Sequence, residues 1–395
     1  MDKMFQVSLF NEKDGHDYYA ELMLPATPYE LLDALERLQF EEGDKISCDI
    51  EDYGRFHFLS PGMENKPNFL ALNALAQRLA LLDEDGQIAF DALVRIERDK
   101  GITSCPLERL VDLAYSTECC DVYPGVSNYG ELGYHYVENG MVPSLKDIPE
   151  EEMAFIDFEK IGRKFSESEG GILTSRGYVM QTEDLKKVFR TLDLTPHRPD
   201  YTILLELTFG QKQATLQLPA DPTRIEDTLG RLGTLDFGDV QITCLDCAVP
   251  ALTPYLRSED HVSEGQVFYI KLLAGELQDM APAQLTKFKA VLEATGEHTV
   301  LGATDIAHDL DAYLFTPRLV SAYDVGLNFL ESELGVHVAE TLLPHVNLYG
   351  YGNALLKDQK AEVTEYGLVS REDGQSLRHT METVKHPEMG GMTMQ

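Results

Sequence analysis

The sequence contains one pattern twice, about 194 positions apart, and this repeat limits the fold more than any other feature. LPATPYELLDALERL spans residues 24–38, and LPADPTRIEDTLGRL spans residues 218–232. Five further blocks match in the same order: 46–50 with 242–246, 73–79 with 271–277, 131–138 with 324–331, 157–162 with 347–352, and 174–179 with 364–369. Because chance does not produce six blocks in order, we expect a tandem duplication with a diverged second copy.

Each copy predicts the same α+β plan. It opens with two strands, and the second ends at Leu-Pro, since proline cannot donate a sheet hydrogen bond. Thr27 or Asp221 is then expected to cap a helix that has proline at its first position. A third strand, a helical middle segment, two helices and a closing strand follow. In copy one these are expected at 45–52, 67–115, 129–139, 157–165 and 172–179.

The repeat also predicts where the domains begin and end. The linker should begin as a helix, because Thr182 precedes helical spacing in TEDLKKVFR, and Pro196 and Pro199 should then stiffen it. Residues after the second copy have no periodicity and are expected to be disordered. The expected parts are unit 1 (1–180, with subdomains of about 1–60, 61–115 and 116–180), a linker (181–200), unit 2 (201–372) and a tail (373–395).

Charge is the most unusual part of the composition. The chain has 67 acidic and 33 basic residues, a net charge of −34 and a pI near 4.6. Residues 111–160 hold eleven acids and only two bases, Lys146 and Lys160. Such a field repels nucleic acid and anionic membranes and attracts basic protein surfaces. A surface that only serves solubility or salt adaptation is the alternative.

The motifs for catalysis and metal binding are incomplete. Cys244 and Cys247 have the spacing of half a zinc site, but no second pair exists, and in a strand they should point to opposite faces. Residues 82–92 resemble a calcium loop but lack two of its essential carboxylates. No Walker loop, HExxH or GxSxG occurs. We therefore expect no enzyme, no cofactor and no metal. Sparse cysteines and the lack of a leader or an apolar span predict a protein of the reducing cytoplasm.

Acidic side chains recur on the outer side of one predicted helix in both copies. In 129–139 the apolar stripe contains Leu132 and Tyr136, and the other side carries Glu131, His135 and Glu138. In the second copy the outer side carries Asp324, Asn328 and Glu331. A merely solvated helix face would give the same pattern.

Copy one resembles the ArdA antirestriction proteins over about residues 4–180. The likeness runs from FQVSLF through ISCDIEDY, the acidic STECCDV and ELGYHYVENG to the closing GGILTSRGYV. Its most specific block is Ile156, Asp157, Phe158, Gly162 and Arg163. The second copy has Asn353 in place of Arg163 and lacks the Glu-Cys-Cys element, so the resemblance there is weaker.

The resemblance implies an elongated protein whose carboxylates imitate DNA phosphates and occupy the DNA groove of type I restriction–modification enzymes. It also implies dimerisation, so the two copies could form an internal pseudo-dimer, or the chain a homodimer. The alternative is an acidic inhibitor of another DNA-binding defence protein, such as a CRISPR effector, or of a transcription regulator. The expected partner-binding residues are Asp112, Glu118, Asp121, Glu131, Glu138, Asp147, Glu150, Glu151, Glu152, Asp157, Glu159, Asp324 and Glu331.

Overall fold

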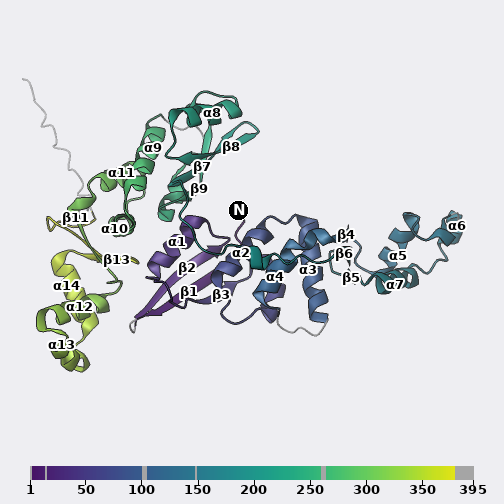
Figure 1. Ribbon diagram of the computed structural model, residues 1–395, viewed down its shortest axis with the longest axis horizontal. Helices are drawn as coiled ribbons and strands as arrows, with labels where there is room; N and C mark the ends of the chain where they lie inside the picture. The colour runs from purple at the N-terminus through teal and green to yellow at the C-terminus, as the bar shows by residue number, and fades with distance from the viewer. Residues whose placement is uncertain (1, 14–15, 100–104, 147–148, 259–263, 379–395) are drawn as a thin grey trace, which may run out of the picture. The chain divides into compact units, whose positions relative to one another are not determined.

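The computed structural model describes residues 2–13, 16–99, 105–146, 149–258 and 264–378. The chain divides into two compact units, Met1–Arg198 and Pro199–Gln395. Figure 1 shows the elements of each unit, which are described separately. Both units mix helices with small antiparallel sheets, so the α+β prediction is confirmed.

Unit 1 opens with a three-stranded antiparallel sheet. Its strands are β1 (Phe5–Lys13), β2 (His16–Leu24) and β3 (Ser47–Asp52), in the order β2-β1-β3. Helix α1 (Pro28–Arg37) follows β2, and its start is confirmed as predicted: the side chain of Thr27 accepts from Glu30 N, and Glu30 reaches back to Thr27 N. Alternate strand residues such as Val7 and Leu9 are buried, which leaves the other face of the sheet outward.

The middle of unit 1 is helical, as expected. It contains α2 (Phe69–Ala80), α3 (Glu84–Asp99) and α4 (Leu107–Tyr115). Asn68 caps α2 through hydrogen bonds from Leu70 N and Ala71 N. These helices supply fully buried residues of the core, among them Leu72 and Phe90.

A second small sheet closes unit 1 and lies between helices. It consists of β4 (Cys120–Pro124), β5 (Ile172–Leu173) and β6 (Gly177–Gln181), in the order β4-β6-β5. Ile88, Ala89 and Ala92 of α3 pack near Val179 on one face. Helices α5 (Tyr129–Glu138) and α7 (Phe158–Glu169) pack on the other, and the short α6 (Glu150–Met153) lies between them in sequence.

One strand of this region was not predicted, and one prediction for it is wrong. Strand β4 was not predicted, because its five residues follow a helix directly and are only half-buried. Residues 172–179 form two short paired strands and not one. A turn separates these strands, in which Thr174 Oγ1 donates to Gly177 O at 2.8 Å and accepts from Gly177 N.

The segment after β6 is not a helix, contrary to the prediction. Its backbone amides donate to side chains elsewhere in unit 1 and not to the backbone carbonyls four residues earlier, as they would in a helix. Lys186 N donates to Ser116 Oγ, and Val188 N and Phe189 N donate to Asp112 Oδ1. Only a single 3₁₀ turn forms, at Phe189–Thr191. Tertiary hydrogen bonds therefore override the local helical spacing.

Unit 2 has nearly the same order of elements. Its first sheet has the order β10-β9-β7-β8, and its second has the order β11-β13-β12. The bounds are β7 (Ile203–Phe209), β8 (Lys212–Leu218), α8 (Pro222–Leu232), β9 (Gln241–Cys247), β10 (Arg257–Ser258), α9 (Glu264–Asp279), α10 (Pro282–Thr295), α11 (Val300–His308), β11 (Tyr313–Pro317), α12 (Ala322–Leu334), α13 (Val336–Leu342), α14 (Leu348–Gln359), β12 (Glu362–Val363) and β13 (Gly367–Arg371).

A β-bulge occurs in the first sheet of each unit. It places Asp52 opposite Gln6 in unit 1 and Asp246 opposite Leu204 in unit 2. Asp52 and Asp246 therefore occupy equivalent positions, which are 194 residues apart. The sequence match of 46–50 with 242–246 has an offset of 196 and is two residues out of register. The bulge also corrects the prediction for the cysteines. Cys244 and Cys247 lie opposite Leu205 and Ile203, which are two positions apart, and therefore share the buried face.

The predicted tail begins in a packed segment. Leu377 is buried, and Arg378 Nε donates to Ala294 O. The expectation of disorder is therefore wrong for residues 373–378. The rest of the predicted tail, 379–395, lies outside the described residues.

Candidate functional site

Asp112 belongs to the internal structure of unit 1. Its Oδ1 accepts hydrogen bonds from Val188 N at 2.7 Å and Phe189 N at 2.9 Å, and the residue is half-buried. A carboxylate that satisfies two backbone amides is costly to withdraw for a partner. Asp112 is therefore engaged within unit 1, and its role towards a partner stays a prediction.

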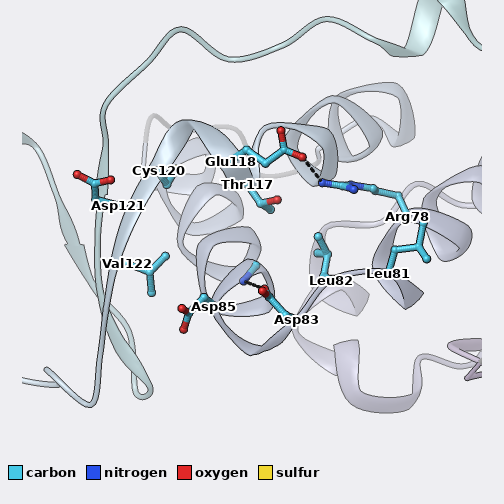
Figure 2. Close-up of a pocket in the computed structure, with 11 residues that line it drawn as sticks. Arg78, Leu81, Leu82, Asp83, Asp85, Thr117, Glu118, Cys120, Asp121 and Val122 are labelled. Carbon is cyan, nitrogen blue, oxygen red and sulfur yellow. Dashed lines mark hydrogen bonds and ion pairs between the residues drawn. The ribbon is translucent and has the colours of Figure 1, made fainter. Parts of the chain in front are cut away.

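Glu118 and Asp121 lie in one pocket, which Figure 2 shows. Glu118 pairs with Arg78 at 3.1 Å and with Lys186 at 2.7 Å, and the hydrogen bond from Lys186 lowers the pKa of its carboxyl. Asp121 is exposed on β4 and makes no ion pair with a described residue. Of the two, only Asp121 offers an uncompensated charge.

Two carboxylates that were not among the expected partner-binding residues, Asp83 and Asp85, line the same pocket. Both are exposed, and Asp83 Oδ1 accepts from Gly86 N at 2.8 Å near the start of α3. The acidic run 83–85 is the signal in the sequence that could have indicated them. The fold brings it beside β4, so the acidic surface extends beyond residues 111–160.

The predicted outer side of α5 is largely confirmed. Leu132 and Tyr136 are buried, whereas Glu131 and Glu138 are exposed and His135 is half-buried. Glu131 Oε2 accepts from Ser127 N at 2.7 Å, and this bond lowers the pKa of the carboxyl. Glu138 makes no ion pair with any described residue.

The carboxylates at the start of α7 are exposed but engaged locally. Asp157 Oδ1 caps the helix by accepting from Lys160 N at 3.0 Å. Glu159 pairs with Arg163 at 2.9 Å, and the Arg163 guanidinium lies 4.7 Å from the centroid of the Tyr129 ring. The ring and the ion pair hold Arg163 on the surface, at the position where unit 2 has Asn353.

Helix α6 presents acids next to an exposed aromatic ring. Glu151 and Glu152 are exposed and unpaired among the described residues, and Phe155 is 90% exposed. The other two predicted acids of this stretch are not placed: Asp147 lies outside the described residues, as does the side chain of Glu150. Charge and an apolar anchor therefore lie together in 151–155.

The acidic face predicted on α12 of unit 2 is wrong. Asp324 is only 6% exposed, and its Oδ2 accepts from Ser321 Oγ at 2.7 Å while its backbone N donates to the same hydroxyl. Ser321 is the N-cap of α12, and Asp324 in the first turn is bound to this cap. Glu331 is half-buried, and only Asn328 of the three is exposed. Unit 2 does not repeat the acidic face of α5.

The described part of the chain offers little for catalysis. It contains no group of three or more His, Cys, Asp or Glu residues that could hold a metal. Burial raises the pKa of the Cys48, Cys120 and Cys244 thiols to about 12, so these thiols are unreactive near neutral pH. None of the helices in the described ranges combines the length and apolar character of a bilayer-spanning segment.

Comparison with known proteins identifies the part of the chain that carries these features. A comparison with curated proteins finds no match. The model of the antirestriction protein (ArdA) family matches residues 11–180. This range includes strands β2 and β3, the helical middle and the second sheet up to residue 180, but only the last three residues of β1. The first unit of this chain therefore belongs to the ArdA antirestriction family.

Proposed function

We propose that this protein is a DNA mimic that occupies the DNA groove of type I restriction–modification enzymes and so protects incoming DNA. It acts by binding and not by catalysis, in the cytoplasm of a bacterial host. The observation that carries the proposal is a set of exposed carboxylates without ion-pair partners among the described residues, on a unit of an antirestriction family.

This set replaces the broader one expected from sequence. Among the predicted residues and the carboxylates of the Figure 2 pocket, five are exposed and neither pair with a cation nor accept a hydrogen bond from a described residue. These are Asp85, Asp121, Glu138, Glu151 and Glu152, which we call the open carboxylates. Duplex DNA carries one negative charge per about 1.7 Å of its axis, and a groove built to bind it is lined with cations. Carboxylates that no internal cation neutralises are the ones that can replace phosphates in such a groove. Glu118 and Glu159 contribute less, because internal cations already compensate them.

We further propose that the two units arose by duplication. Each has two glycines where its paired helices touch: Gly133 and Gly162 in α5 and α7, and Gly326 and Gly352 in α12 and α14. These glycines occupy matching positions of the repeat. The loss of the acidic face on α12 suggests that unit 2 supports unit 1 as an internal pseudo-dimer partner and contributes less to inhibition. The units then correspond to residues 1–180 and 201–372.

A competition experiment tests the proposal. The full chain is titrated against a purified type I enzyme bound to labelled cognate DNA, at low and high salt, with a type II endonuclease as control. We expect displacement from the type I enzyme alone, and weaker displacement at high salt because counterions compete for the groove. If the chain displaces DNA from neither enzyme, the target is another DNA-binding defence protein and the type I assignment is wrong.

A further inference from the structure

The outward face of the sheet β2-β1-β3 carries two aromatic rings. Phe10 of β1 and Tyr19 of β2 lie directly opposite each other, with ring centroids 5.2 Å apart and an angle of 50° between the ring planes. Phe10 is 36% exposed, Tyr19 is 43% exposed, and Met23 on the same face is also 43% exposed. Large apolar side chains exposed together are characteristic of an interaction site.

Carboxylates lie on both sides of this aromatic row. One neighbouring row across the strands is Glu21, Ser8 and Asp49, and the other pairs Asp17 with Glu12. Successive rows on one face of a sheet lie about 6.8 Å apart. Tyr19 Oη donates to Glu21 Oε1 at 2.5 Å and lies 3.4 Å from Ser8 Oγ, which fixes the ring against the sheet.

Glu12, Asp17, Glu21 and Asp49 form no ion pair with a described residue, although Arg37 Nη2 donates to the backbone oxygen of Glu21 at the edge of the sheet. Glu12 and Asp17 are directly opposite each other and exposed, an arrangement of like charges that destabilises an antiparallel pair. The adjacent Lys13 is directed to Glu41 and Asp44. At the described outward positions of the three strands there is no lysine or arginine. A cationic partner would relieve this repulsion.

The same fold in unit 2 lacks these features. Thr208 stands opposite Gln213 and Gln241 in the row that corresponds to the aromatic one. In the next row Glu206 stands between Thr215 and Thr243. The rings and the flanking acids are therefore not a requirement of the sheet.

We propose that the outward face of β2-β1-β3 is a docking surface for arginine side chains of a basic protein. A guanidinium stacks on an aromatic face more readily than an ammonium does, and its planar fork matches a carboxylate. Phe10 and Tyr19 provide the stacking surface, and Glu21 and Asp17 provide carboxylates on either side. A surface that mimicked phosphates alone would have no use for the rings. The inference does not depend on the type I target.

The test compares octa-arginine and octa-lysine, two peptides of equal charge, as probes of the full chain. Binding is followed at the site itself, through the NMR ring signals of Phe10 and Tyr19 in selectively labelled protein near physiological salt. We expect half-saturation of these signals at about two- to fivefold lower concentration of octa-arginine than of octa-lysine, which is the size of an exposed cation–π contact.

Leucine variants separate stacking from charge. Phe10→Leu is observed through the ring signals of Tyr19, and Tyr19→Leu through those of Phe10. Each variant keeps apolar area and loses one ring. We therefore expect the ratio of the half-saturation concentrations of octa-lysine and octa-arginine to fall towards one. The matched change Thr208→Leu in unit 2 should leave it unchanged. Equal affinity for both peptides in the unmodified protein, or an unchanged preference in both ring variants, would overturn the inference. Neither result would alter the outcome of the DNA competition.

Discussion

A Cβ atom added to Gly162 would lie 1.9 Å from the carbonyl oxygen of Tyr129, a distance that no real contact allows. Gly133 stands in the reciprocal position, since its Cβ would lie 1.9 Å from Phe158 O. Backbone therefore packs directly on backbone where α5 crosses α7. Gly162 is part of the most specific family-like block, and its role is to permit this contact.

Substitution of Gly162 by alanine should separate the two helices. Overpacking of this kind costs roughly 1–3 kcal/mol. We expect faster hydrogen exchange at the amides of α5 and α7 and a lower free energy of unfolding for unit 1. The control is Gly230→Ala in α8, where the added Cβ meets no atom within 4 Å and helix stability should rise by up to about 1 kcal/mol. Equal exchange in Gly162→Ala and the unmodified chain would contradict the packing described.

The carboxylate of Glu169, at the end of α7, accepts hydrogen bonds from two buried tyrosines. Glu169 Oε2 accepts from Tyr136 Oη at 2.7 Å and from Tyr178 Oη at 3.1 Å. Glu169→Ala leaves both hydroxyls without their acceptor and should lower the free energy of unfolding of unit 1 by roughly 1–3 kcal/mol. Glu167→Ala, on the exposed side of the same helix, should have little effect in the same urea titration. Equal decreases in the free energy of unfolding of both variants would show that the two tyrosine hydrogen bonds do not stabilise unit 1.

The same cluster predicts a dependence on alkaline pH. Burial raises the pKa of Tyr136 and Tyr178 above the usual value of about 10, and the hydrogen bond to Glu169 and the negative charge of Glu169 raise it further. Above pH 10 the unfolded chain loses these protons while the folded chain retains them. Their contribution is therefore complete below pH 10 and falls as the pH rises further. Urea midpoints measured from pH 9 to 11 should fall less steeply in Tyr178→Phe; identical slopes would count against a raised pKa.

The segment 186–191 should detach when Asp112 is changed. Asp112→Ala removes the acceptor of two backbone amides, so we expect trypsin to cleave after Lys186, Lys187 or Arg190 roughly tenfold faster. Glu108→Ala removes an exposed charge from the same helix and should leave the cleavage rate unchanged. No acceleration in Asp112→Ala would mean that other contacts hold the segment.

Local signals in the sequence predicted much of this fold. Thr27 and Asp221 cap helices with proline at the first position, as expected, because capping depends on residues within one turn. The buried stripe of α5 follows from spacing alone. The helical segments of the middle region were likewise recognisable from periodicity.

What the sequence could not predict depends on contacts between distant residues. Asp324 was expected on the outer side of its helix, yet it is buried and its carboxylate accepts from the hydroxyl of Ser321, the N-cap of α12. TEDLKKVFR has helical spacing, but Asp112 and Ser116 bind its amides. Asp85 joins Asp121 only because α3 packs on the sheet that contains β4. Such partners cannot be read from one segment.

The most direct test of the central claim compares two variants that have the same net charge but lose their carboxylates at different places in unit 1. One variant neutralises four open carboxylates, with Asp121→Asn, Glu138→Gln, Glu151→Gln and Glu152→Gln. Its matched control neutralises four exposed carboxylates elsewhere in unit 1, with Glu42→Gln, Glu64→Gln, Glu108→Gln and Asp184→Asn. Displacement of DNA from a type I enzyme is measured for both at one salt concentration. We predict that the first variant loses at least tenfold in potency while the control stays close to the unmodified protein. Equal potency of the two variants would contradict a mimic surface at the open carboxylates.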